Sequence, residues 1–322
     1  MTSLEAAAGG VELPFASPQR RFRVLRRLLR RPVAVIAIVV ILTVYLAGIL
    51  APWVAPYGFE ETDVRHGFAG ASWEHPLGTD RLGRDMLSRV IWSAQTTVVV
   101  SAAAMLTGSL ALGVTLGLLA GYRGGMTDAV IMRLGDAFHS VPTILLLLII
   151  TATLKAKVVD LFRDIEDFTG IDGLVSSGAP SYFLVFGALS IFGWVGIARL
   201  VRSQVLALRE SQYVLAARAA GASTPRILFF HLLPNVGNLL IVALTLSLAG
   251  AAAAEVGLTF LGIGVQPPHP SFGLMISEAV GLSNVREHFN LILIPAVVLA
   301  SLMLSFNLLG DALTDVLSPR RR

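Results

Sequence analysis

Long apolar runs are the feature that most constrains how this chain can fold. From Pro32 to Leu50 no charged residue interrupts an apolar stretch. A helix of that length, at about 1.5 Å per residue, crosses a hydrocarbon core of about 30 Å. Similar runs recur along the chain and predict six membrane-spanning helices. Their predicted bounds are about 32–51, 96–120, 129–154, 182–201, 236–263 and 289–310.

The composition agrees with an all-α integral membrane protein. Hydrophobic residues make up 55% of the chain and charged residues 14%, and the mean hydropathy is +0.74, which lies outside the range of soluble globular proteins. We predict one membrane domain, residues 32–322, after a basic segment, residues 1–31. The chain has no cysteine, which excludes disulfides and thiolate metal sites.

A basic segment precedes the first span. Residues 1–18 are small and polar, which predicts no regular structure, and Arg20–Arg31 alternates arginines with apolar residues. We expect this basic segment to lie on the inner membrane surface. A cleaved signal peptide is the alternative, but the basic region is long and the apolar run that follows exceeds a signal's hydrophobic core.

The distribution of basic residues predicts the orientation. Most of the 25 Lys and Arg residues fall in the segments that are inside if both termini are cytoplasmic, as the positive-inside rule requires. The same assignment places the loop 203–234, between the fourth and fifth spans, in the cytoplasm. The net charge of +4 is explained by arginines at membrane edges, so we expect membrane lipid, and no nucleic acid, as a partner.

Glycine spacing predicts a close helix contact in the second span. Gly113, Gly117 and Gly121 recur every fourth residue. Such small residues allow two helix backbones to approach in lipid.

The segment Tyr213–Asn235 predicts two helices joined by a glycine elbow. Ser211 is placed to cap the first helix, and Gly221 follows its end as a left-handed residue. Pro225 suits the first turn of the second helix, which we expect to end at Pro234. Alanines dominate the first helix, and such small side chains suit a docking surface. A side chain at Gly221 is expected to clash with the elbow.

The spacing of Ala216-Ala217, Gly221 and Leu233-Pro234 resembles the "EAA" loop of ABC-type importer permeases. Leu215 stands where that motif has Glu, and the segment 231–235, His-Leu-Leu-Pro-Asn, resembles the dipeptide and oligopeptide branch. Four more segments are similar to the same branch. They are residues 75–89, 121–142, 255–273 and 306–320.

The resemblance implies a permease subunit in a bacterial cytoplasmic membrane. Its partners would be a second permease, two ATPases, separate or fused, that carry ATP and Mg²⁺, and an extracytoplasmic substrate-binding protein. This chain itself would hold no cofactor and no metal and catalyse nothing. The cargo would be dipeptides or oligopeptides, with nickel, haem or another chelate as alternatives. The residues that would couple to the ATPase are Ser211, Gln212, Tyr213, Ala216, Ala217, Arg218, Gly221 and Ala222.

Charged residues at membrane depth are further candidates. Asp136 lies at or just inside the predicted inner interface, and Glu255 lies well within the fifth span. A carboxylate there is costly unless it is paired or faces a polar cavity. Glu255 therefore either bonds to another helix or lines the translocation path. The charges from Asp80 to Asp85, taken by themselves, indicate a solvated run.

Motifs of other functional classes are missing. The sequence has no GxxxxGK[ST] phosphate loop, no HExxH and no GxSxG, which argues against an ATPase, a zinc protease or a serine hydrolase. An ion-coupled secondary transporter would show repeats, broken helices or several buried carboxylates, and it has no need for the cytoplasmic elbow. A structural or signalling membrane protein needs neither the elbow nor the glycine-packed spans.

Overall fold

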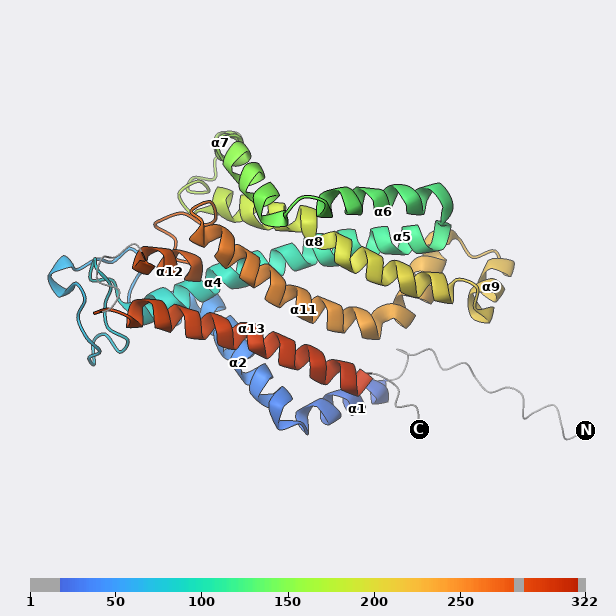
Figure 1. The fold of residues 1–322 in the computed structure, drawn as a ribbon, viewed down its shortest axis with the longest axis horizontal. Coiled ribbons are helices and arrows are strands. Elements are labelled where there is room, and N and C mark those ends of the chain that lie inside the picture. The colour runs from blue at the N-terminus through green and yellow to red at the C-terminus, as the bar shows by residue number, and fades with distance from the viewer. Residues whose placement is uncertain (1–17, 281–286, 318–322) are drawn as a thin grey trace, which may run out of the picture.

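The computed structural model describes residues 18–280 and 287–317, and within these residues all regular structure is helical. The helices form an elongated bundle (Figure 1). Helix α9 (Gln212–Ala219) lies at one end, and α12 (Phe272–Val280) and the irregular segment 55–85 lie at the other. The predicted irregular segment before residue 18 and the C-terminal arginines, 320–322, fall outside the described residues.

Five helices in the described part of the chain are long and apolar enough to cross a membrane. Two of them, Met86–Arg123 and Thr224–Phe260, are composites in which short π-helical stretches continue an α-helix. The five spans are Pro32–Ile49, Met86–Arg123, Ala179–Leu208, Thr224–Phe260 and Asn290–Leu317.

The helix expected at 129–154 is interrupted. Helix α6 (Gly125–His139) ends before Ser140, and α7 (Thr143–Thr169) begins after Pro142. Proline lacks the N–H that a continuous helix needs and disfavours helical geometry at the residue before it, here Val141. Helix α7 then continues far beyond the predicted end of the span, to Thr169.

The contact predicted from glycine spacing is confirmed. Helix α4 (Met86–Ala104) continues through η3 (Met105–Val114) and α5 (Thr115–Arg123), and the glycines of this composite face α8 (Ala179–Leu208). A Cβ placed on Gly117 would lie 2.7 Å from the carbonyl oxygen of Ala198. The two backbones therefore touch where any larger residue would push them apart.

The N-terminal helices pack against the last one. Helices α1 (Pro18–Leu29) and α2 (Pro32–Ile49) meet α13 (Asn290–Leu317) through Leu28, Ala34 and Ala312. An ion pair of 2.5 Å joins Arg31 to Asp315. The first and last described helices thus approach each other toward the α9 end of the bundle (Figure 1).

The second helix of the elbow does not end at Pro234. It starts as α10 (Thr224–Arg226), passes through the π-helical η4 (Ile227–Leu232) and continues as α11 (Leu233–Phe260). Pro234 occupies the first turn of α11 after the wider π turn, where a missing N–H costs least. The elbow is therefore joined without a break to a membrane span.

Candidate functional site

The glycine elbow has the geometry that its sequence predicts. Gly221 has a φ of +77°, in the left-handed region that favours glycine. The Gly221 N–H donates to the carbonyl of Arg218, and the Ala222 N–H donates to the carbonyl of Ala217, each at 3.0 Å. These two bonds make a Schellman motif, which satisfies the last carbonyls of α9 and reverses the chain.

The predicted cap Ser211, and Ser223 at the corresponding position before α10, do not cap through their side chains. Ser211 and Ser223 have extended backbone geometry before α9 and α10, but neither side chain accepts a capping hydrogen bond. The Ser211 hydroxyl instead donates to the carbonyl of Leu208 at 2.5 Å. It therefore ties the start of the elbow to the end of α8.

One side chain of α9 anchors the elbow in the bundle. Val214 is the buried residue of this helix, with 0% of its surface exposed. It belongs to an apolar cluster that includes residues of α5, α8, η4 and α11. The buried members are Val114, Leu118, Ile197, Val201, Val205, Val214, Ile227, Leu228, Leu232, Val236 and Leu240.

The predicted coupling residues are exposed or half-buried, and none of them is fully buried. Gln212, Ala216 and Arg218 are exposed, as are Leu215 and Gly221. The expected clash at Gly221 is wrong, because a Cβ there would meet nothing within 4 Å. A substitution at this position would act through backbone strain and added charge instead.

Three half-buried residues complete the set. Tyr213 packs against the apolar cluster, and its hydroxyl is buried without a hydrogen-bond partner in the described part of the chain. Ala217, which accepts the Ala222 bond, and Ala222 are also partly buried. Arg218 lies 5.5 Å above the ring of Tyr122, a cation–π contact that links α9 to α5.

Asp136 is paired with a neighbouring helix. Arg199 of α8 donates to its carboxylate at 2.6 Å, and both side chains are exposed on the surface of this chain. The same two helices are joined a second time, because Arg202 of α8 makes a two-bond ion pair with Asp128 of α6.

Glu255 is fully buried, with 0% of its surface exposed. Its carboxylate accepts hydrogen bonds from Thr97 of α4 at 3.2 Å and from Thr259, one turn along α11, at 3.1 Å. The Thr259 hydroxyl also accepts the N–H of Val265 at 3.1 Å. Glu255 therefore bonds to another helix, which is one of the two alternatives predicted for this residue.

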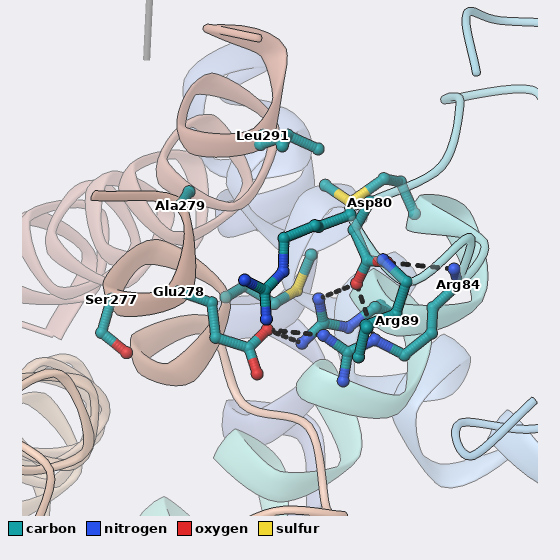
Figure 2. A pocket seen from close by; sticks show the side chains of 11 residues that line it. Asp80, Arg84, Arg89, Ser277, Glu278, Ala279 and Leu291 are labelled. Atoms are coloured by element: carbon teal, nitrogen blue, oxygen red, sulfur yellow. Dashed lines mark hydrogen bonds and ion pairs between the residues drawn. The ribbon is translucent and has the colours of Figure 1, made fainter. Parts of the chain in front are cut away.

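The charges near residue 80 are not a solvated run. Asp80 is 5% exposed and Arg89 is 3% exposed, and together with Arg84 and Glu278 they form a network at the α12 end (Figure 2). Arg84 and Arg89 both donate to Asp80, each at 2.6 Å, and both donate to Glu278, at 2.7 and 2.8 Å. The network fastens the segment before α4 to α12.

A cavity of about 210 Å³ opens beside this network. We call it the arginine cavity because three arginines line it: Arg81 and Arg84 on the segment before α4, and Arg89 near the start of α4. Residues of α12 and the start of α13 form the opposite wall (Figure 2). The lining residues are Asp80, Arg81, Leu82, Arg84, Met86, Arg89, Met275, Ser277, Glu278, Ala279 and Leu291.

Sequence reasoning missed Val214 and Glu278. Val214 is one apolar residue among the alanines of α9, and only its burial marks it as the anchor. Glu278 lies far along the chain from Arg84 and Arg89, so nothing in the local pattern indicates the pairing. The spacing of Asp80 and Arg84 is the one available signal, since charges four residues apart can meet.

Comparison with known proteins places these features in a family. Residues 113–322 match the binding-protein-dependent transport system inner membrane component. Residues 21–70 match the N-terminal transmembrane domain of oligopeptide transport permease C. The longer match contains the elbow, and residues 71–112 lie between the two matches.

Curated relatives resemble the chain over most of its length. The oligopeptide transport permease OppC of Bacillus subtilis is 32% identical, over 90% of this chain and 86% of the relative. The dipeptide transport permease DppC of Haemophilus influenzae is 34% identical, over 89% and 90%. A putative peptide transport permease of Brucella suis is 36% identical, over 92% and 90%.

The matched region contains the glycine elbow, the span that continues from it and the helices packed around Val214. It is also longer than half of the chain, and the relatives align almost end to end. The chain belongs to the family of binding-protein-dependent inner-membrane transport components.

Proposed function

We propose that this chain is a permease subunit that forms half of the translocation path of an ABC importer for dipeptides or oligopeptides. A second, similar permease would form the other half. Two ATP-hydrolysing subunits and an extracytoplasmic binding protein would complete the assembly. Support comes from relatives that are named for oligopeptide and dipeptide transport.

The structure of the elbow is the main support for the proposed coupling to the ATPases. Its exposed surface includes Ala216, Ala219, Ala220 and Gly221, whose small side chains let another protein approach the backbone closely. Its buried anchor, Val214, contacts the cluster shared by α5, α8 and α11. A push on α9 therefore reaches three helices at once through close-packed side chains, which resist compression.

We place the α9 end in the cytoplasm and the α12 end on the opposite side. This orientation follows the positive-inside bias and gives the elbow access to ATPases. A sixth membrane crossing would be made by α6 and α7 across their break at 140–142. Asp136 and Glu255 would then hold neighbouring helices together through their bonds to Arg199 and Thr97.

The test of coupling is Gly221→Asp in the assembled transporter in lipid vesicles. Asp tolerates the left-handed conformation better than most residues, so we expect normal insertion and continued ATP hydrolysis. The added charge on the docking surface should lower peptide uptake per ATP about fivefold or more, the lower range of measured coupling energies. Gly221→Asn is the matched control, with similar backbone tolerance and no charge.

Normal ATP-driven uptake by Gly221→Asp would contradict the role of the elbow. The cargo needs its own measurement, which is native mass spectrometry of the binding protein purified with the complex. Short peptides are expected. A haem or a metal chelate in their place would contradict the peptide assignment and leave the coupling role standing.

A further inference from the structure

The two carboxylates beside the arginine cavity are held very differently. Asp80 uses both oxygens: one accepts the backbone N–H groups of Leu82 and Arg84, and the other accepts the side chains of Arg84 and Arg89. These donors lie within ten residues of Asp80, so the arrangement is local. Asp80 is thus a fixed part of the segment before α4.

Glu278 is held by one oxygen alone. Its Oε2 accepts both arginine bonds, while no described residue donates to its Oε1. It belongs to a different element, α12, and its side chain is 33% exposed, compared with 7% for Asp80. Glu278 can therefore leave the arginines without disturbing Asp80.

The cavity favours a second anion. Three arginines line it against two carboxylates, and the buried Nε of Arg89 has no partner among the described residues. If Glu278 withdraws, Arg84 and Arg89 each present a free Nη2 beside the cavity. Guanidinium groups match carboxylates in geometry and bind them by strong, charge-assisted hydrogen bonds.

The remaining walls limit what can enter. Met86, Met275 and Leu291 line the cavity with apolar surface, which suits a short aliphatic stem. Arg84 and Arg89 already bind one carboxylate here, that of Glu278. A carboxylate at the end of a small, partly apolar group therefore fits both the charge and the walls.

We propose that the arginine cavity is a carboxylate-binding site in which an incoming carboxylate takes the place of Glu278 on Arg84 and Arg89. This inference rests on the proposed function, because it assumes that the α12 end faces the side from which cargo arrives. The carboxylate can come from the C-terminus of a peptide cargo or from an acidic side chain of the binding protein.

The first arm of the test uses the full-length chain in lipid nanodiscs, with dialanine and its C-terminal amide as probes in calorimetric titrations. Wild type should bind dialanine and not the amide. Glu278→Gln should bind dialanine about tenfold more tightly, since removing an internal competitor raises the fraction of open sites. Arg81→Ala should bind more weakly, and Glu210→Gln, at the opposite end of the molecule, is the matched control.

The second arm measures the affinity of the assembled transporter for its binding protein. If the binding protein supplies the carboxylate, dialanine binds to no variant, while Glu278→Gln raises that affinity and Arg81→Ala lowers it. Equal binding of dialanine and the amide, or no effect of either variant in both arms, would overturn the inference. Normal peptide uptake in that case would leave the proposed function intact, whereas wild type that lacks uptake would overturn the function itself.

Discussion

Different interactions stabilise the two ends of the bundle. At the α9 end, Val214 and its neighbours form an apolar cluster. At the α12 end, Asp80, Arg84, Arg89 and Glu278 form a buried charge network. Apolar contacts are non-directional and close-packed, so they transmit displacement. Charge pairs are directional and costly to leave unpaired, so they hold one arrangement until a replacement partner arrives.

The largest expected effect comes from removing one partner of the charge network. Arg89→Ala removes the more deeply buried of the two cations that Asp80 and Glu278 share and leaves only Arg84. Breaking a buried pair in this way typically costs about 3–5 kcal/mol in the free energy of unfolding. Thermal and denaturant unfolding of the full chain in nanodiscs would measure it. Arg163→Ala, which breaks an exposed pair with Asp160, is the control and should cost at most about 1 kcal/mol.

If Arg89→Ala and Arg163→Ala proved equally mild, the α12 end would not depend on its charges. The contrast between the two ends would then fail.

A smaller loss of stability is expected from Val214→Ala. The change deletes two buried methyl groups, each worth about 0.8 kcal/mol, and leaves a small cavity. We expect a loss of about 2 kcal/mol together with a clear drop in uptake per ATP, because α9 loses its buried anchor in the apolar cluster. The exposed Leu215→Ala is the matched control. Unchanged coupling in Val214→Ala would show that motion reaches the spans by another route.

The smallest effects compare a helix cap at each end. Asp85 accepts the N–H of Ser88 at 2.7 Å as the N-cap of α4, so Asp85→Ala should cost about 0.5–2 kcal/mol. Ser211 occupies the cap position of α9 without capping it, and Ser211→Ala should stay within about 0.5 kcal/mol. Chemical denaturation of both variants measures the difference. A larger loss for Ser211→Ala would mean that its bond to Leu208 holds the elbow in place.

Local patterns predicted a large part of the fold and of the elbow. The left-handed Gly221 was predictable because few residues besides glycine fit that conformation. The contact of α5 with α8 was predictable because Gly117 and Gly121 leave room for a backbone. The break near Pro142 and the continuation past Pro234 were not predicted, because the effect of a proline depends on whether the preceding turn can absorb its missing N–H.

What the sequence alone determined is an all-helical membrane protein with a glycine elbow between two spans. Hydrophobic length, arginine placement and glycine spacing are visible in the sequence without knowing which segments pack together. Only the tertiary structure decided which side chains anchor and which charges pair. Glu278 meets Arg84 and Arg89 across most of the chain, and Val214 becomes an anchor only when α5, α8 and α11 surround it. Burial and charge pairing depend on neighbours that folding brings together.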